Sequence, residues 1–146
     1  MKSQNRDKIN KSVKFREQFR PFAPMALQSE MHEWFDIPKA AEPMLPYMVC
    51  TVGVKEEKQA LIPAVTHIDQ SARVQSIDER HNGQIMSIIS SFAEKTDVPV
   101  LLNTSFNLKG DPMVSSPVDA VATFLQSDLD LLYIEGFCVG QRKKRR

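Results

Sequence analysis

Apolar positions along the chain follow two periods, that of a helix and that of a strand. In residues 82–95, isoleucine and phenylalanine recur at i, i+3, i+4 and i+7, which predicts an amphipathic helix with one apolar stripe. Short β-branched or apolar runs between turn residues predict strands. The stripe consists of Ile85, Ile88, Ile89 and Phe92, and the predicted strands span residues 47–54, 62–66, 72–77, 98–102 and 131–139.

A second helix is predicted from the residues that would start it. Ser116 can cap this helix, Pro117 suits its first turn, and Asp119 stands where a capping-box acid would. The helix should run to about residue 126 and face the core with Val121, Phe124 and Leu125. Prolines in the first third of the chain predict extended and turning backbone, broken by a short helix over residues 26–35: Pro21, Pro24, Pro38, Pro43 and Pro46.

Strands and helices are mixed without strict alternation, so we expect an α/β to α+β fold with one mixed sheet. The 146 residues suit a single domain, with a lead-in over residues 1–9 and a basic tail over residues 141–146. No apolar run approaches the roughly 18–20 residues that span a bilayer, and the N-terminus lacks the apolar segment of a secretory signal. Cys50 and Cys138 are predicted to be small core hydrophobes in a reducing, cytoplasmic compartment.

The net charge of +1 hides an asymmetry. Residues 1–20 carry seven Lys/Arg and two acids, and residues 142–146 are all basic, so the body between them is acidic. A basic N-terminal segment on an acidic body favours an anionic ligand near residues 8–20. The basic tail is typical of a solvated end, with nucleic-acid contact as the alternative.

Three cations stand close together in residues 14–24. In an extended segment Lys14, Arg16 and Arg20 would share one face, with Phe15 and Phe19 on the other. Arginine offers a fork to phosphate oxygens and lysine a point charge, so this face could hold a phosphate. The alternative is a solvated basic strand.

A polar segment follows the predicted strand at residues 98–102. Residues 103–107 place Asn103, Ser105 and Asn107 after a buried strand, where α/β proteins bind ligands, although a plain turn is the alternative. Residues 110–114 should close that loop through a tight glycine turn.

Residues 67–75 carry a histidine, an acid and an arginine between two strands. His67 is a candidate acid or base, Asp69 a possible hydrogen-bond partner of His67, and Arg73 a fourth cation for an anion site. A structural role for His67 is the alternative. The histidines and cysteines of the chain lack metal-ligand spacing, so no protein-bound metal is expected.

Together these segments resemble the C-terminal domain of the nodulation-type O-carbamoyltransferases, a family that includes antibiotic-tailoring carbamoyltransferases. The resemblance runs from about residue 10 to residue 140, and RPFAP with LNTSFN is its most specific part. It also includes the segments 67–75, 110–114 and 130–131.

The resemblance implies a YrdC-like domain, which is a twisted mixed sheet flanked by helices. Such domains carry a Lys-x-Arg and a Ser-x-Asn signature for ATP and phosphate groups, which here falls on Lys14, Arg16, Ser105 and Asn107. Lys14, Arg16, His67 and Arg73 are the implied catalytic residues. The implied substrate- and ATP-binding residues are Lys14, Arg16, Arg20, Arg73, Asn103, Ser105 and Asn107.

The resemblance further implies that the domain takes ATP, with Mg²⁺ on its triphosphate, and carbamoyl phosphate, and makes carbamoyl-adenylate. A separate N-terminal Kae1-like domain, which holds the metal and the acceptor site, then moves the carbamoyl group to a hydroxyl. The chain begins where the C-terminal domain should begin, so we expect a truncated piece, a split gene product or a free-standing descendant. A binding module without turnover is one alternative function, and a domain that binds RNA is a less favoured one.

Two positions depart from the family pattern. The usual Asp-Gly-Thr becomes Asp69-Gln70-Ser71, and loss of the glycine is expected to reshape that turn. The usual glutamate after the loop glycine is Asp111, which is a milder change.

Overall fold

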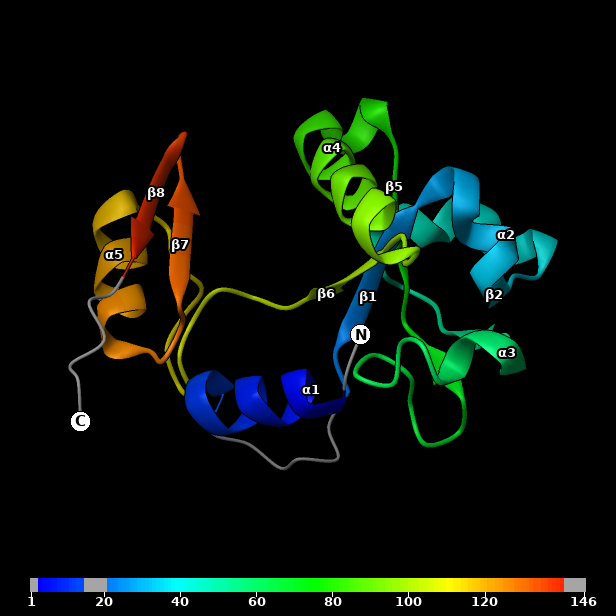
Figure 1. Ribbon diagram of the computed structural model, residues 1–146, viewed down its shortest axis with the longest axis horizontal. Helices are drawn as coiled ribbons and strands as arrows, with labels where there is room; N and C mark the ends of the chain where they lie inside the picture. The colour runs from blue at the N-terminus through cyan, green and yellow to red at the C-terminus, as the bar shows by residue number, and fades with distance from the viewer. Residues whose placement is uncertain (1–2, 15–20, 141–146) are drawn as a thin grey trace. The chain divides into compact units, whose positions relative to one another are not determined.

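The computed structural model describes residues 3–14 and 21–140, and the chain divides into two compact units. Unit 1 comprises residues 1–6 and 21–104, and unit 2 comprises residues 7–20 and 105–146. Small sheets are flanked by helices in a mixed α/β arrangement, which confirms the predicted fold class (Figure 1). The strands form three small sheets rather than one.

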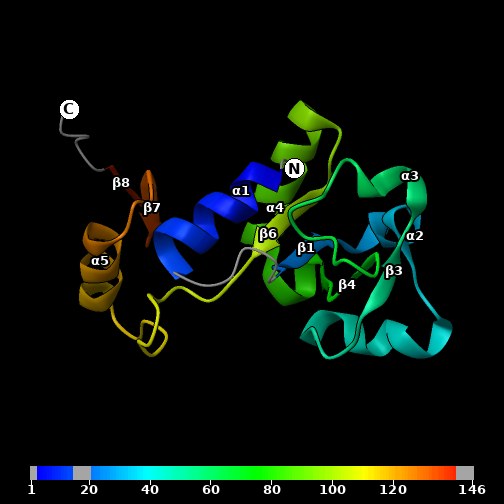
Figure 2. The same cartoon turned by 90° about the horizontal axis from the view of Figure 1, so that it is seen from below.

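The central sheet of unit 1 has the strand order β5-β1-β6. Strand β1 (Ala23–Leu27) pairs in parallel with β5 (Gln75–Ile77) and antiparallel with β6 (Val100–Asn103), so the sheet is mixed as predicted. Helix α4 (Glu79–Thr96) packs on this sheet and lies along it in both views (Figures 1 and 2). The strand predicted at residues 98–102 corresponds to β6, and its bounds were right to within two residues.

Helix α4 confirms the predicted helix and shows why it starts where it does. Asn82 is extended (φ −166°, ψ 86°), and its Oδ1 accepts a hydrogen bond from the Ile85 backbone N–H at 3.0 Å. Asn82 therefore caps the long part of the helix in the usual way of an asparagine. Of the apolar stripe, Ile89 is fully buried whereas Ile88 is 52% exposed, because the small sheet covers only part of the helix face.

The second sheet of unit 1 contains β2 (Phe35–Asp36), β3 (Val52–Val54) and β4 (Ser71–Ala72) in that order. Its flanking helical segments are η2 (Gln28–Glu30), α2 (Met31–Trp34), η3 (Lys39–Tyr47) and α3 (Glu56–Gln59). The largest buried side chains around these elements include Met31, Phe35, Ile62, Val65 and Val74.

Several helices and strands predicted for this region differ from the structure in their bounds or are absent from it. The helix expected over residues 26–35 begins only at residue 28, because Ala26 and Leu27 belong to β1. The strand at residues 47–54 shrinks to Val52–Val54, residues 62–66 form no strand, and residues 72–77 divide between two sheets. Buried apolar residues in short runs fit a core-facing turn as well as a strand, so the pattern did not distinguish them.

The prolines of residues 39–47 were expected in extended backbone, yet they lie in the 3₁₀ helix η3. Pro43 and Pro46 lack an N–H, but the φ of about −65° that the proline ring imposes lies within the range of a 3₁₀ helix. Ala41 and Leu45 supply that buried face. The segment ends at Met48, which has a left-handed backbone (φ 53°).

Unit 2 contains η1 (Asn10–Lys14), a π-helical segment, and α5 (Pro117–Gln126) with the hairpin of β7 (Leu131–Ile134) and β8 (Phe137–Gly140). Helix α1 (Ser3–Ile9) contains the boundary between the two units. Helix α5 lies beside the hairpin in both views (Figures 1 and 2).

The predicted start of α5 is confirmed. Ser116 Oγ accepts a hydrogen bond from the Asp119 N–H at 3.1 Å and donates one to Asp119 Oδ2 at 2.7 Å. The predicted inward face is only partly right, because Phe124 is fully buried while Val121 and Leu125 are exposed. Cys138 is exposed as well, so its prediction as a core residue was wrong.

Among the residues that the structure describes, no helix has both the length and the apolar character needed to cross a membrane.

Candidate functional site

Lys14 and the loop at residues 105–107 come together in unit 2, although 91 residues separate Lys14 from Ser105 in sequence. Lys14 Nζ donates to Ser105 O at 2.6 Å and to Asn107 Oδ1 at 2.6 Å. Ser105 Oγ and Asn107 O lie at 3.0 and 3.2 Å from the same nitrogen. The side chain is nearly buried, with 8% of Lys14 exposed. These four acceptors are neutral oxygens that orient the ammonium. We call this group the lysine cradle.

The amide of Asn107 holds the lysine cradle in shape. Asn107 Nδ2 donates to the Asp111 carbonyl at 2.8 Å, and a carbonyl oxygen only accepts, so Asn107 Oδ1 must face Lys14. Ser105 Oγ also donates to Asn107 Oδ1, at 2.7 Å. The loop closes through the Asp111 N–H to Leu108 O bond and through Gly110 (φ 87°), as the sequence predicted for this turn.

The predicted cation face is changed by the structure. Lys14 belongs to the helical segment η1 and not to an extended strand, so the alternation that was expected to align it with Arg16 and Arg20 does not hold at its position. Arg16 and Arg20 lie outside the described residues. Phe22, the last aromatic residue of the segment, is buried.

The second group of predicted residues lies in unit 1, at the turn between His67 and Ser71. The His67 N–H donates to Ser71 O at 2.8 Å, and the Gln70 N–H donates to His67 O at 3.0 Å. Gln70 has a left-handed backbone (φ 65°), as the third residue of a three-residue hairpin loop normally does. Gln70 therefore adopts a left-handed backbone at the position where the family pattern has glycine.

His67 and Asp69 are joined through Ser71, which the sequence analysis did not propose as a site residue. Ser71 Oγ donates its one proton to Asp69 Oδ1 at 2.7 Å. The 3.1 Å contact between Ser71 Oγ and His67 Nδ1 is then made by an Nδ1–H donor, so the neutral ring carries its lone pair on Nε2. Burial lowers the pKa of His67, with a further decrease from Arg73 and an opposing increase from Asp69. The hydrogen bond from Ser71 lowers the pKa of Asp69.

The lowered pKa of His67 predicts a pH dependence of stability. The folded chain binds fewer protons at this site than the unfolded chain, so stability is present above the ordinary histidine pKa of about 6.5 and falls as pH drops toward the folded value. We expect the free-energy difference between the wild type and His67→Gln to shrink from pH 7.5 to pH 5. Urea unfolding at several pH values measures it, and a difference that stays constant would contradict the lowered pKa.

The left-handed backbone of Gln70 predicts the effect of restoring a glycine. A left-handed backbone destabilises the folded chain by roughly 1–2 kcal/mol when an L-residue replaces glycine there. Part of this difference is offset because glycine has more conformational freedom in the unfolded chain. Gln70 Oε1 also accepts an exposed hydrogen bond from Gln59 Nε2 at 2.9 Å, which any truncation removes. Gln70→Gly should therefore be more stable than the matched variant Gln70→Ala by about 1 kcal/mol. Equal urea midpoints for the two variants would argue against the assigned turn.

Asn103 and Arg73 also belong to unit 1. Asn103 ends β6, and its Nδ2 donates to Gln75 Oε1 at 2.8 Å across strand β1. Gln75 lies in the predicted segment but was not chosen from sequence, since no local pattern marks a glutamine whose partner is 28 residues away. Arg73 is exposed, and it acts on His67 through its charge.

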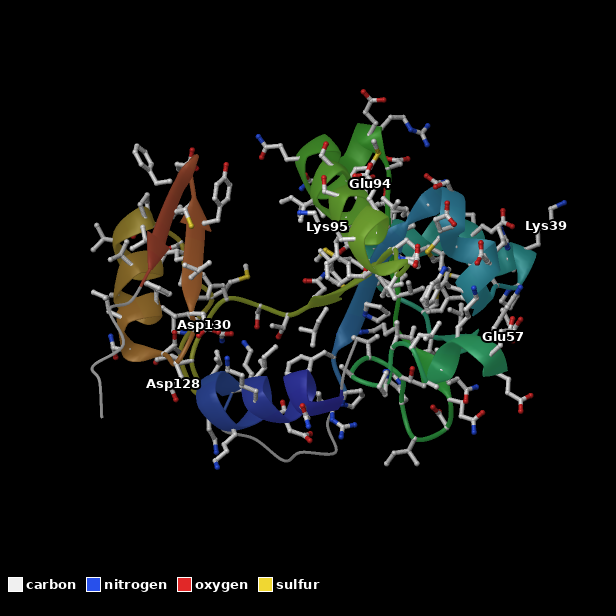
Figure 3. All side chains as sticks on the ribbon, in the orientation of Figure 1. Lys39, Glu57, Glu94, Lys95, Asp128 and Asp130 are labelled. Atoms are coloured by element: carbon white, nitrogen blue, oxygen red, sulfur yellow. The ribbon has the colours of Figure 1, made fainter. Side chains whose placement is uncertain are left out.

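The structure thus assembles the predicted residues as two groups. Lys14, Ser105 and Asn107 meet in unit 2, and His67, Asp69 and Asn103 lie with their partners in unit 1. Asp130, labelled in Figure 3, forms an exposed ion pair with Lys8 at 2.8 Å within unit 2. Within residues 3–14 and 21–140, no three His, Cys, Asp or Glu side chains gather in a way that could hold a metal ion.

Comparison with known proteins gives consistent matches over nearly the whole chain. The family model described as "Carbamoyltransferase C-terminus" matches residues 1–141. Nodulation protein NolO of Bradyrhizobium diazoefficiens is 42% identical over 96% of this chain and 25% of its own length, and nodulation protein NolNO of Sinorhizobium fredii is 43% identical over 94% and 20%. A 3'-hydroxymethylcephem-O-carbamoyltransferase of Amycolatopsis lactamdurans is 36% identical over 80% and 21%. The chain spans about a fifth to a quarter of the length of these relatives.

Proposed function

Because this chain belongs to the family of carbamoyltransferase C-terminal domains, we propose that it binds ATP and carbamoyl phosphate and forms carbamoyl-adenylate. A separate N-terminal Kae1-like domain or chain then transfers the carbamoyl group to a hydroxyl. The greater length of the relatives supports such a partner.

The lysine cradle is the observation that carries this proposal. Lys14 and the pair Ser105 and Asn107 are the two halves of the phosphate signature implied by the family resemblance, and they contact each other within 3.2 Å. The four oxygens hold the nearly buried ammonium in one place, and an ammonium can bind a phosphate group as a point charge. In this proposal Ser105 and Asn107 position the ammonium and Lys14 supplies the charge.

The proposed reaction needs cations because both substrates are anions. Lys14, Arg16, Arg20 and Arg73 would neutralise phosphate charge, which is the main task of a protein in such transfers. Mg²⁺ would enter with the triphosphate. Formation of carbamoyl-adenylate from the two substrates consumes one water and releases phosphate and pyrophosphate.

His67 suits the role of proton acceptor in this reaction. Its ring is neutral near pH 7, and the bond from Nδ1 to Ser71 leaves the Nε2 lone pair available for a proton. We assign to Nε2 the proton released when the water is consumed.

The test is ATP–pyrophosphate exchange dependent on carbamoyl phosphate, measured with the purified 146-residue chain and Mg²⁺. Label should pass from pyrophosphate into ATP only when carbamoyl phosphate is present. Calorimetric binding of both substrates without exchange would instead assign the chain as a binding module. Failure to bind either substrate would refute the proposed function.

Arg16→Ala should weaken the binding of ATP or carbamoyl phosphate by about 1.5–3 kcal/mol, the range of a hydrogen bond to a charged group. Arg16 is the second residue of the Lys-x-Arg signature. Isothermal calorimetry measures the affinity, and circular dichroism verifies that the variant is folded. Unchanged affinity in a folded variant would remove Arg16 from the site.

A further inference from the structure

The side-chain amide of Asn103 has its orientation set by a chain of hydrogen bonds in unit 1 that starts at a backbone carbonyl. Gln75 Nε2 donates to Pro46 O at 3.1 Å. A carbonyl oxygen can only accept, so Gln75 must turn its NH₂ group to Pro46 and its Oε1 the other way. Gln75 Oε1 accepts from Asn103 Nδ2 at 2.8 Å, which in turn directs the NH₂ group of Asn103 toward Gln75.

The second N–H of Asn103 is also engaged. Asn103 Nδ2 lies 3.4 Å from Met48 Sδ, and a thioether sulfur acts only as a weak acceptor. Met48 follows η3, two residues after Pro46, so both partners of the amide network come from the same end of that segment. Both N–H groups of the Asn103 amide are therefore occupied by acceptors within the chain.

Only the oxygen of the Asn103 amide is left to meet a ligand. Asn103 is half-buried at the end of β6, and no described residue donates a hydrogen bond to its Oδ1. An amide oxygen carries partial negative charge and accepts hydrogen bonds, so it suits an N–H donor and disfavours a phosphate oxygen. The constraint from Pro46 and Gln75 keeps the amide from turning over to serve a phosphate.

We infer that Asn103 is a specificity-determining residue that accepts a hydrogen bond from a neutral, planar amino group of the ligand. This inference rests on the proposed function, whose two substrates each carry one such group: the amino group of carbamoyl phosphate and the exocyclic amino group of adenine. Asn103 thus accepts a hydrogen bond from an amino group of the ligand, and the cations bind its phosphate groups.

The experiment compares each substrate with an analogue that lacks only the amino donor. Acetyl phosphate replaces the carbamoyl amino group by a methyl group, and inosine triphosphate replaces the adenine amino group by a carbonyl. Calorimetry of the full chain with these four ligands is expected to show that Asn103→Ala weakens one amino ligand about five- to tenfold, as loss of a single hydrogen bond implies. The matching analogue should bind the variant and the wild type equally.

Two further variants separate recognition from folding. Thr104→Ala removes the exposed neighbouring side chain and should leave all four affinities unchanged. Gln75→Leu removes the group that orients the Asn103 amide, so the preference for the amino ligand over its analogue should fall while the analogue still binds. Should Asn103→Ala fail to fold, Gln75→Leu and the wild-type preference provide the same test.

The outcomes are distinct. A loss confined to carbamoyl phosphate places Asn103 at the carbamoyl group, and a loss confined to ATP places it at adenine; either result supports the inference. An equal loss for an amino ligand and its analogue, or no loss for either amino ligand, overturns it while the proposed function stands. A wild-type chain that binds neither carbamoyl phosphate nor ATP refutes both.

Discussion

Lys14→Met should reduce carbamoyl phosphate-dependent pyrophosphate exchange by about 100-fold or more, corresponding to about 2.7 kcal/mol. Methionine has an unbranched stem of similar length, with sulfur in place of one methylene, and lacks the ammonium. The change leaves four oxygens of Ser105 and Asn107 without their common donor and removes a charge that would attract the proposed anionic substrates. A charged hydrogen bond alone is worth about 1.5–3 kcal/mol.

The matched control is Lys11→Met, which removes an exposed lysine from the same segment η1. Lys11→Met should keep both exchange and affinity. Lys14→Arg retains the charge, but its planar fork does not match acceptors gathered around one nitrogen, so it should recover only part of the activity. Native exchange in a folded Lys14→Met chain would show that the lysine cradle is merely structural.

The second large effect concerns transfer. The 146 residues assayed alone, with ATP, Mg²⁺ and carbamoyl phosphate, should produce no O-carbamoylated acceptor. An adenylate intermediate is exposed to hydrolysis unless it passes to the acceptor within a site closed to water. The chain spans about a fifth to a quarter of its relatives, and we expect the acceptor site in the remaining part.

This prediction is tested by adding the N-terminal part of a relative such as NolO, prepared as a separate chain, and measuring carbamoylation of a hydroxyl acceptor by mass spectrometry. Product should appear only in the mixture. Adding the same N-terminal part together with the Lys14→Met chain should give about 100-fold less product. Robust carbamoylation by the 146-residue chain alone would overturn the division of labour proposed above.

Local features were predictable because neighbouring residues determine them. The start of α5 follows from Ser116 and Asp119, which bond to each other across three residues. The turn at Gly110 follows from the conformational freedom of glycine. The start of the long helix at Asn82 belongs to the same class, since its cap is a contact with Ile85.

Burial and pairing over long separations were not predictable in this way. Residues 72–77 were predicted as one strand, but Ala72 pairs with β3 and residues 75–77 pair with β1, in different sheets. The exposed positions of Val121 and Leu125 reflect how small a surface the hairpin offers to α5. An amphipathic pattern indicates which residues prefer burial, and only the area of the packing partner decides how many obtain it.

The same distinction between local and long-range features applies to the candidate site residues. The sequence by itself indicated the candidate residues by their type and spacing: Lys14, His67, Asn103, Ser105 and Asn107. Only the tertiary structure decided what each can do, because hydrogen-bond direction depends on partners far away in sequence. The Pro46 carbonyl fixes the orientation of the Gln75 amide, which in turn leaves Asn103 Oδ1 without a donor among the described residues. The lysine cradle joins residues more than 90 positions apart.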